Sequence, residues 1–310
     1  MRLTSHGFPP EADGPSSWLQ TLDAWDFIGT PGNDRIDGTG SPDRIDVSQG
    51  GKDVVKPIAD NDFVYFGAAF TGADRVNGGK GIDTVALDGD YSGGVEVQAN
   101  SLVEIESLVL SGGSFTITGY LGFQQAGVTF VDAHSLTAGQ SLNIDVGSVG
   151  DLDVVGGAGA DVIHAAANGG SSLLLGDEGN DTLIGGSGAT RFVGQGGADR
   201  IEMAGASDLA SYDSKTESTG KSYDTIENFG ASGGKIWLLF DSDEAVDGVQ
   251  FDFHLGKTAE RVGDVTAHYK ASIDQTIVKV FTNADDKADF VVHLTGDIHV
   301  TAADFVFGFG

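Results

Sequence analysis

The sequence contains no cysteine, and its 310 residues include only 6 prolines, 2 methionines and 17 lysines and arginines. Without cysteine, the chain forms neither a disulfide framework nor a thiolate metal site. No basic segment followed by an apolar stretch marks a secretory signal peptide, and no run is apolar enough for a transmembrane helix, so direct membrane insertion is not expected. The scarcity of basic residues excludes nucleic acid and anionic lipid as direct partners, because both bind positively charged faces.

Short carboxylates and glycine are what the sequence has in excess. Acidic residues number 46 and give a formal net charge of −29, and 36 of them are Asp while only 10 are Glu. A solvated helical surface would favour Glu, which is the better helix former. Gly contributes 48 residues. Because 40% of the residues are apolar, the chain has enough apolar side chains to build a core, so a folded protein is expected. The excess of acidic residues suits binding of a multivalent cation.

A nine-residue repeat accounts for both excesses. Residues 176–202 read GDEGNDTLI, GGSGATRFV and GQGGADRIE without interruption, and residues 29–46 read GTPGNDRID and GTGSPDRID. With the units at 48–56, 57–65, 69–77, 78–86, 156–164 and 167–175, eleven units fit the template G-G-x-G-x-D-x-U-x, in which U is a large apolar residue. Position 6 is Asp in nine units and position 4 is Gly in nine. Position 8 is apolar in all eleven: Ile36, Ile45, Val55, Val64, Val76, Val85, Ile163, Leu174, Leu183, Phe192 and Ile201.

The repeat predicts a parallel β-roll. Six residues of Gly and Asp character make a tight turn, with Gly where positive φ or close backbone approach is needed. The remaining three form a short strand whose central side chain points inward. Two units complete one coil, and each turn offers carbonyl oxygens and a carboxylate, which suit Ca²⁺ with six or more ligands better than Mg²⁺. The alternative, a flexible Gly/Asp-rich linker, predicts neither the fixed phase nor the apolar eighth residue.

These units resemble the RTX (repeats-in-toxin) family of secreted calcium-binding proteins, which includes the β-roll domains of serralysin-type proteases, lipases, adhesins and surface-layer proteins. The resemblance implies that each Ca²⁺ lies between the turns of units i and i+2, because alternate units share an edge. It makes the position-6 carboxylates candidate ligands: Asp34, Asp43, Asp53, Asp62, Asp74, Asp83, Asp161, Asp181 and Asp199. The position-4 glycines are further candidates: Gly32, Gly81, Gly159, Gly179 and Gly197.

The two arrays differ in how they distribute carboxylates between edges. In the N-terminal array, Asp34, Asp53 and Asp74 are predicted to line one edge, and Asp43, Asp62 and Asp83 the other. In the second array, Asp161, Asp181 and Asp199 share one edge, while the opposite edge offers the neutral hydroxyls of Ser172 and Thr190 at position 6. We therefore expect strong calcium binding on only the first of these edges, with about two ions.

The predicted fold is all-β, a right-handed parallel β-roll or β-solenoid with a C-terminal antiparallel β-sandwich cap. Residues 87–155 lack the repeat but contain alternating strand-like runs separated by Gly-rich turns, which predicts a solenoid spacer of wider coils. The predicted strands of this spacer are 95–97, 105–110, 115–118, 128–131, 142–146 and 152–155. The spacing of Trp18, Leu19, Leu22, Trp25 and Phe27 predicts a short amphipathic helix that caps the first coil, or an aromatic contact between molecules. The predicted divisions are a cap segment at 1–28, β-rolls at 29–86 and 156–202 on either side of the spacer, and the C-terminal cap at 203–310.

The C-terminal segment also resembles that of RTX proteins. The pattern DTIENF…KIWLLF and DFVVHLTG…TAADFVF is similar to the capping domain of the family, whose uncleaved C-terminus is read by a type I secretion machine. Asp304, followed by Phe305, Val306, Phe307 and Phe309, suits such a signal, and a final β-strand is a second interpretation that is compatible with it. The resemblance implies type I secretion machinery as a partner and an extracellular or cell-surface location.

Evidence for an enzyme is weak in the sequence. None of the seven histidines forms H-E-x-x-H, so the zinc protease motif of the serralysin relatives is missing. A G-x-S-x-G match at 230–234 has no following helix to build a nucleophile elbow. His134 with Asp132 and Asp145 is better explained by isolated surface residues, and a glycosidase-like carboxylate pair cannot be separated from calcium ligands. We expect no catalytic residues and no organic cofactor.

Two functions fit this sequence. The first is a secreted structural protein that stays unfolded in calcium-poor cytosol, folds on calcium outside the cell, and self-associates into a surface layer, filament or biofilm matrix. The alternative is a secreted carbohydrate-active enzyme or glycan-binding adhesin that uses the wall at 87–155 to bind a cell-surface polysaccharide. The first is favoured because nearly the whole chain is scaffold.

Overall fold

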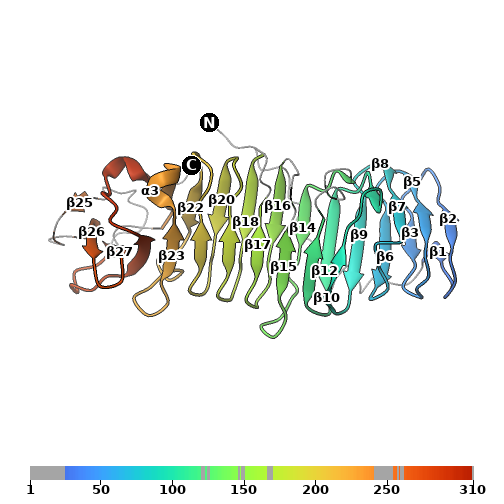
Figure 1. The fold of residues 1–310 in the computed structure, drawn as a ribbon, viewed down its shortest axis with the longest axis horizontal. Helices are drawn as coiled ribbons and strands as arrows, with labels where there is room; N and C mark the ends of the chain where they lie inside the picture. Colours follow the sequence, from blue (N-terminus) through green and yellow to red (C-terminus); the bar gives the residue numbers. More distant parts are fainter. Residues whose placement is uncertain are drawn as a thin grey trace.

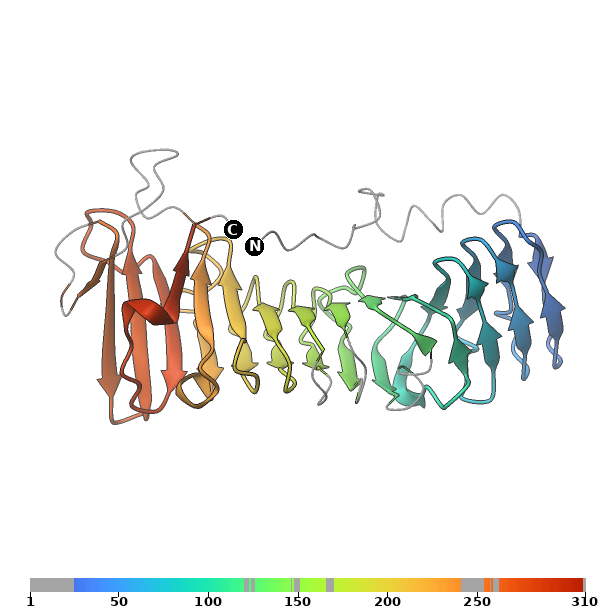
Figure 2. The same cartoon turned by 90° about the horizontal axis from the view of Figure 1, so that it is seen from above.

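Two long β-sheets face each other across a narrow apolar core and give the molecule an elongated shape (Figures 1 and 2). The chain alternates between the sheets, and about nine coils stack along the long axis. This computed structural model describes residues 25–119, 123, 126–145, 147, 151–165, 170–240, 254–256, 258 and 262–308. Within this part of the chain, no helix combines the length and apolar character needed to cross a membrane.

Sheet A runs the length of the molecule, and its twelve strands are all parallel. In spatial order they are β1 (Phe27–Ile28), β3 (Arg44–Asp46), β6 (Phe63–Gly67), β9 (Thr84–Asp88), β12 (Ser107–Ser111), β14 (Phe130–Asp132), β16 (Leu152–Val155), β18 (Ser172–Leu175), β20 (Thr190–Val193), β22 (Leu209–Tyr212), β24 (Lys235–Leu238) and β29 (Phe305–Phe307).

The opposite side of the solenoid is divided between two sheets. Sheet B covers the N-terminal coils with β11 (Leu102–Val103), β7 (Arg75–Asn77), β4 (Val54–Lys56) and β2 (Arg35–Asp37). Sheet D covers the rest with β10 (Tyr91–Glu96), β13 (Phe115–Thr118), β15 (Leu142–Asp145), β17 (Val162–His164), β19 (Thr182–Ile184), β21 (Arg200–Glu202), β23 (Asp224–Glu227), β28 (Phe290–Thr295), β27 (Gln275–Phe281), β26 (Asp264–Lys270) and β25 (His254–Gly256). A small sheet C pairs β5 (Ile58–Ala59) with β8 (Gly79–Lys80), and two short helical turns, α3 (Phe229–Ser232) and η1 (Ala302–Asp304), lie near the C-terminal end.

The core is built from the middle residue of each short strand. The register of sheet A aligns one inward row along the whole molecule: Phe27, Ile45, Val64, Val85, Leu108, Val131, Val154, Leu174, Phe192, Ala210, Ile236 and Phe305. Of the eleven position-8 residues predicted to point inward, ten are buried and Ile36, in the first coil, is partly buried against them. Burying each such side chain contributes roughly 1.5–3 kcal/mol. The predicted apolar column is confirmed.

The spacer continues the same two sheets with longer coils. Thr84 pairs with Ser107, and Ser107 pairs with Phe130, so each of these coils spans 23 residues. In the second array, Thr182 pairs with Arg200, a coil of 18 residues. Two of the predicted spacer strands, at 115–118 and 152–155, have the same bounds in the structure.

The C-terminal region contains the predicted antiparallel sheet, but over fewer strands than the alternation indicated. Strands β26, β27 and β28 pair antiparallel and extend the end of sheet D. Strands β22, β23, β24 and β29, which we expected in the antiparallel cap, instead continue the solenoid in parallel. Alternation of apolar and polar residues has the same period in both kinds of sheet, so it does not distinguish them.

Most of the predicted N-terminal cap helix lies outside the described residues. Its last residue, Phe27, belongs to strand β1 rather than to a helix. The ring of Trp25 stacks on Phe63 and Tyr65 of strand β6, with centroid distances of 6.3 and 5.7 Å, and the Arg44 guanidinium lies 5.3 Å from its centroid. This aromatic residue therefore packs on the outer side of sheet A.

Candidate metal centre

The position-6 aspartates occupy the turns that enter the strands, on the two long edges of the solenoid. Asp34, Asp53 and Asp74 each precede a strand of sheet B, whereas Asp43, Asp62 and Asp83 precede strands of sheet A. Asp161, Asp181 and Asp199 precede strands of sheet D. The structure thus brings together the three groups of aspartates in the edges that the sequence predicted for them.

A ladder of hydrogen bonds joins successive aspartates along the sheet D edge. The backbone NH of Asp161 donates to Oδ1 of Asp181 at 2.8 Å, and the NH of Asp181 donates to Oδ1 of Asp199 at 2.9 Å. The NH of Asp199 donates in turn to Oδ1 of Asp224 at 2.9 Å. At the other end, Asp161 accepts from the NH of Leu142 at 2.7 Å. Each carboxylate therefore completes the turn of the coil before it.

The N-terminal array carries the same ladder on both edges. On the sheet B edge, the backbone NH of Asp34 donates to Oδ1 of Asp53 at 2.9 Å, and the NH of Asp53 donates to Oδ1 of Asp74 at 2.8 Å. On the sheet A edge, the NH of Asp43 donates to Oδ1 of Asp62 at 2.8 Å, and the NH of Asp62 donates to Oδ1 of Asp83 at 2.9 Å. The NH of Asp83 then donates to the side chain of Glu106 at 2.8 Å, which ends the series in the spacer.

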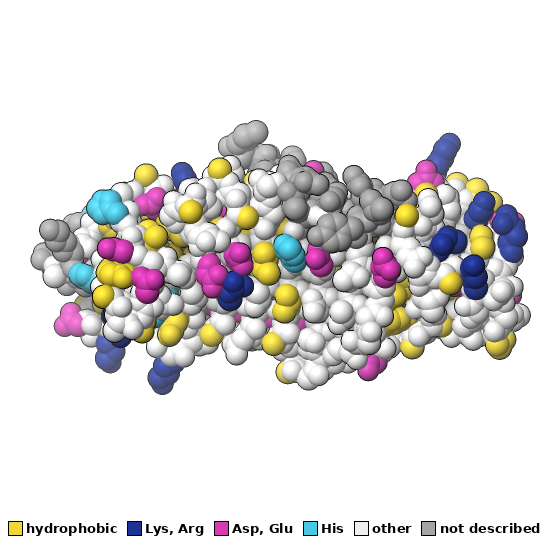
Figure 3. All heavy atoms as spheres, in the orientation of Figure 1, with side chains coloured by type: hydrophobic (Ala, Val, Ile, Leu, Met, Phe, Trp, Pro, Cys, Tyr) yellow, Lys and Arg dark blue, Asp and Glu magenta, His cyan; other side chains and the backbone are white. Residues whose placement is uncertain are grey.

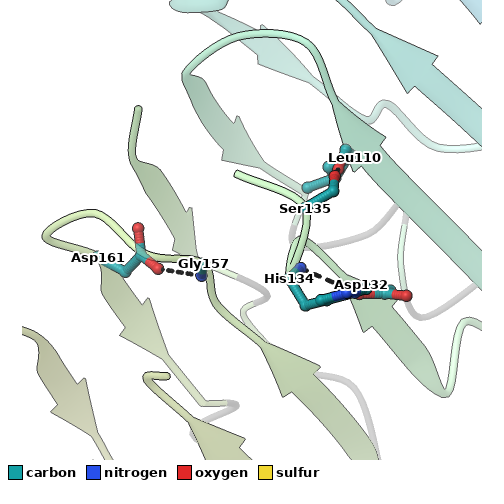
Figure 4. A network of polar contacts seen from close by, with 6 residues as sticks. All are labelled: Leu110, Asp132, His134, Ser135, Gly157 and Asp161. Atoms are coloured by element: carbon teal, nitrogen blue, oxygen red, sulfur yellow. Dashed lines mark hydrogen bonds and ion pairs between the residues drawn. The ribbon is translucent and has the colours of Figure 1, made fainter. Parts of the chain in front are cut away.

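The second carboxylate oxygens divide the turns into two kinds. In one kind, Oδ2 accepts a backbone NH from its own turn, as in Asp43 from Thr39 at 2.6 Å and in Asp161 from Gly157 at 2.7 Å (Figure 4). In the other kind, Oδ2 is buried and has no hydrogen-bond partner in the structure: Asp62, Asp83, Asp181, Asp199 and Asp224. A buried oxygen of this kind is costly unless a cation or a proton binds it.

Burial raises the pKa of the carboxyls in this second group. Desolvation is the largest cause throughout, and it raises the pKa of Asp62, Asp83 and Asp199 to about 6. The pKa of Asp181 rises to about 8, through burial and then repulsion from Asp199, Asp161 and Asp177. Burial and the charge of Asp199 hold the pKa of Asp224 well above its ordinary range. Without a counter-ion, the closed turns therefore disfavour the charged form of these carboxyls.

Two sets of glycines keep the space beside these carboxylates open. At position 1, an added Cβ on Gly176 or Gly194 would clash with the Oδ2 of Asp181 or Asp199. At position 4, an added Cβ on Gly179 or Gly197 would clash with the carbonyl oxygen of the glycine one coil earlier, and these two glycines have φ of +135° and +153°. The turns stack so closely that only glycine fits there.

The donors that surround this space fit calcium. Among the described residues, no three His, Asp or Glu side chains converge on one point, so a site made only of side chains does not form. The available set is a pair of carboxylates from adjacent coils together with main-chain carbonyls such as Gly159 O and Gly179 O. Hard oxygen donors of mixed type suit the flexible, high coordination of Ca²⁺. The unpartnered Oδ2 atoms of Asp181 and Asp199 are the ones that a cation would satisfy.

The opposite edge of the second array lacks such a set. Thr190 is buried at position 6, and its NH donates to Oδ1 of Asp208 at 2.9 Å. The Oδ2 of Asp208 accepts from the NH groups of Ala204 and Gly205, both at 2.8 Å. Since both oxygens are already hydrogen-bonded, this carboxylate resembles the satisfied kind of turn.

Three acidic residues of the ladders were missed by the sequence prediction. Glu106, Asp208 and Asp224 all lie outside the nonapeptide frames, yet each accepts the NH of the preceding turn. All three share a shorter signal, an acidic residue two positions before an inward apolar one: Leu108, Ala210 and Ile226. A search for this tripeptide after each repeat array finds them.

The candidates for catalysis remain separate in the structure. His134 Nδ1 lies 3.3 Å from Asp132 Oδ1 in an exposed turn (Figure 4), while Asp145 lies 3.7 Å from a different histidine, His164. In the G-x-S-x-G match, the Ser232 hydroxyl donates to the carbonyl of Phe229 at 3.2 Å, within the single turn of α3. His299 and Asp304 line a cavity beside this turn together with Gly230, Gly233 and Gly234, and Ser232 is not among the residues that line it.

Comparison with known families agrees with this geometry. Residues 121–307 match the peptidase M10 serralysin C-terminal family, and residues 28–51 and 69–89 match the RTX calcium-binding nonapeptide repeat, with four copies. The first match covers more than half of the chain. No curated protein matches the sequence at a significant level.

Proposed function

We propose that this chain, which belongs to the serralysin C-terminal family and carries RTX repeats, is an extracellular structural protein that self-associates after calcium closes its turns. Calcium binding and export by type I secretion follow from the family. The assembly into a surface layer, filament or biofilm matrix is the part we propose. The carboxylate ladders support it, because they place candidate calcium ligands along most of the molecule instead of in one local site.

The single observation behind this proposal is the set of five buried carboxylate oxygens without a partner. In calcium-poor cytosol, these charges repel one another and disfavour the closed turns. Outside the cell, calcium binds the native state, and each site adds roughly 1.4 kcal/mol when free calcium is about ten times Kd. Several sites together reach the stability of an ordinary domain, about 5–15 kcal/mol. Calcium therefore acts as the folding switch for the proposed assembly.

The experiment is electron microscopy of the purified full chain in millimolar calcium and after exhaustive chelation, with circular dichroism on the same samples. We expect ordered sheets or filaments and a β-rich spectrum in calcium, and neither after chelation. Magnesium at the same concentration is the control and is expected to produce neither. Monomeric particles in calcium would refute assembly, and an equally folded chain after chelation would refute the switch.

The alternative is a secreted carbohydrate-active enzyme or glycan-binding adhesin that uses the wall at 87–155, and the charge of this wall counts against one class of glycan, the anionic polysaccharides. No Lys or Arg occurs between Lys80 and Arg191. On the face seen in Figure 3, cationic side chains gather toward the two ends of the molecule. Without cationic side chains, this wall would repel an anionic polysaccharide, and the structural role is favoured over binding of that class.

A further inference from the structure

In eight turns of the solenoid, the peptide unit that enters the turn takes one of two orientations. We call the residue four positions before a turn aspartate its entry residue. In four turns, the NH of the entry residue donates to Oδ2 of that aspartate at 2.6–2.8 Å, and the entry residues are Thr30, Thr39, Gly157 and Ala204. In four other turns, the entry residue has a positive φ of 63–98°, and the entry residues are Ile58, Gly79, Asp177 and Gln195. None of the first four has a positive φ.

These two orientations correspond to the two kinds of carboxylate. The four entry residues with positive φ precede the aspartates whose Oδ2 is buried and has no hydrogen-bond partner: Asp62, Asp83, Asp181 and Asp199. Because the peptide unit is planar, turning it over reverses the directions of its NH and its C=O together. One orientation therefore points a donor at the carboxylate, and the other removes that donor and leaves the Oδ2 for a cation.

A second oxygen atom lies beside the unpartnered Oδ2 of Asp181. This Oδ2 and the carbonyl oxygen of Gly194, in the next coil, both lie close to the position that a Cβ on Gly176 would occupy. A carboxylate and a main-chain carbonyl are ligands that Ca²⁺ takes in sites of mixed oxygen donors. The turn of Asp181 thus offers calcium two ligands from successive coils.

The turn of Asp43 has the same pair of oxygens but also supplies a donor. The Oδ2 of Asp43 and the carbonyl oxygen of Pro57 lie close to the position that a Cβ on Gly38 would occupy. Here the NH of Thr39 donates to this Oδ2 at 2.6 Å, and the hydroxyl of Thr39 donates to Oδ1 at 3.0 Å. With both carboxylate oxygens hydrogen-bonded within the turn, the cost of burying them is offset without a cation.

We propose that the entry residue decides which turns bind calcium. Turns whose entry residue has a positive φ bind the ion, whereas turns whose entry residue is threonine are closed by its NH and hydroxyl and bind none. In the turn of Asp34, Thr30 makes the same pair of bonds, at 2.7 Å from its NH and 3.0 Å from its hydroxyl. The repeat family establishes that the chain binds calcium, and the inference concerns where it binds. It holds whether or not the chain self-associates.

Two entry residues separate the contributions of the side chain. Ile58 is β-branched, and a β-branched residue at φ +98° is a conformational outlier. It has no hydroxyl to donate to Asp62, so β-branching alone does not hold the NH inward. Gly157 has neither a hydroxyl nor a branch, so its turn is free to change orientation when calcium binds beside Asp161. The threonine hydroxyl is therefore the part of the side chain that excludes calcium.

The inference places calcium on one edge in each array. The unpartnered aspartates lie on the sheet A edge of the N-terminal array and on the sheet D edge of the second array: Asp62 and Asp83, then Asp181 and Asp199. On the sheet B edge, Thr71 donates its NH and its hydroxyl to Oδ2 of Asp74 at 2.8 and 2.9 Å, which closes that turn in the same way. The calcium-binding edge thus changes sides between the two arrays.

The test counts the ions bound by the full chain, using equilibrium dialysis against radioactive calcium at saturation. Thr39→Gly removes the hydroxyl and permits positive φ, so we expect the variant to bind one ion more than the wild type. Ser41→Gly is the matched control, because it adds a glycine to the same turn without changing the entry residue. This control is expected to leave the count unchanged.

The reverse change is Gln195→Thr, which introduces a hydroxyl at the entry to the Asp199 turn and is expected to lose one ion. Gln195→Asn is its control, since asparagine tolerates positive φ, and it is expected to keep the wild-type count. Circular dichroism in calcium checks that each variant folds.

A gain of one ion by Thr39→Gly but not by Ser41→Gly supports the inference. Equal counts in the wild type and Thr39→Gly overturn it, and so does a gain by Ser41→Gly, which would assign the effect to the glycine content of the turn. If Thr39→Gly does not fold, the two Gln195 variants decide, and equal counts for Gln195→Thr and Gln195→Asn overturn the inference.

Discussion

Replacing Asp181 with Asn is expected to have opposite effects with and without calcium. The Asn side chain keeps an oxygen that can accept the Asp161 NH, as Asp181 Oδ1 does at 2.8 Å. It removes a buried ionisable carboxyl group, whose pKa is raised to about 8 by desolvation and by neighbouring carboxylates. Without calcium, the variant is therefore expected to be as ordered as the wild type or more ordered, because the repulsion is gone.

In calcium, the same change removes a carboxylate ligand that borders two candidate calcium sites, one between Asp161 and Asp181 and one between Asp181 and Asp199. At about ten times Kd, the loss of two sites lowers the free energy of unfolding by roughly 3 kcal/mol. Urea unfolding in calcium measures this loss, and calcium titration followed by far-ultraviolet circular dichroism is expected to show a higher midpoint. Ser172→Ala, at the same repeat position on the opposite edge, is the control and leaves both unchanged. An equal loss of stability with and without calcium would show that Asp181 only holds the turn.

Three further predictions follow from the turns. Gly197→Ala, at φ +153° against the Gly179 carbonyl, is expected to lower unfolding free energy by about 2–4 kcal/mol, whereas Gly40→Ala, with open space around it, has little effect in the same urea assay. In calcium-free buffer, the raised pKa values of Asp62, Asp181 and Asp199 mean that the native state binds more protons than the unfolded state. The β-rich circular dichroism signal is therefore expected to increase as pH falls from 8 to 5. A signal that is flat, or that rises with pH, contradicts this. In calcium, protons compete for the same oxygens, so the titration midpoint is expected to move to higher calcium at pH 5 than at pH 8, and an unchanged midpoint counts against carboxylate ligation.

The sequence predicted the parts of the fold that repeat locally. A nine-residue period with an apolar eighth position identified the inward row, because the same spacing sets both the turn and the strand. It also predicted which aspartates share an edge, since alternate units return to the same side. The spacer strands at 115–118 and 152–155 were found from alternation alone.

What the sequence did not predict depends on pairing between distant residues. The NH of Asp199 reaches Asp224 across 25 positions, because the intervening loop has no fixed length in the repeat. The parallel course of β22, β24 and β29 is set by crossovers through sheet D, which leave no mark on the alternation within each strand. Whether an Oδ2 atom accepts a hydrogen bond depends on the geometry of its turn. Turns of both kinds carry the same residue, Asp, at position 6, so position 6 alone does not distinguish them in the sequence.

The direction of the ladders makes the two ends of the solenoid unequal. Every NH in the ladder is satisfied by a carboxylate from the coil nearer the C-terminus. Removing a coil from the N-terminal end exposes only a carboxylate oxygen, which water solvates readily. Removing a coil from the C-terminal end leaves a buried amide NH without its acceptor. Shortening this molecule from its beginning is thus cheaper than shortening it from its end.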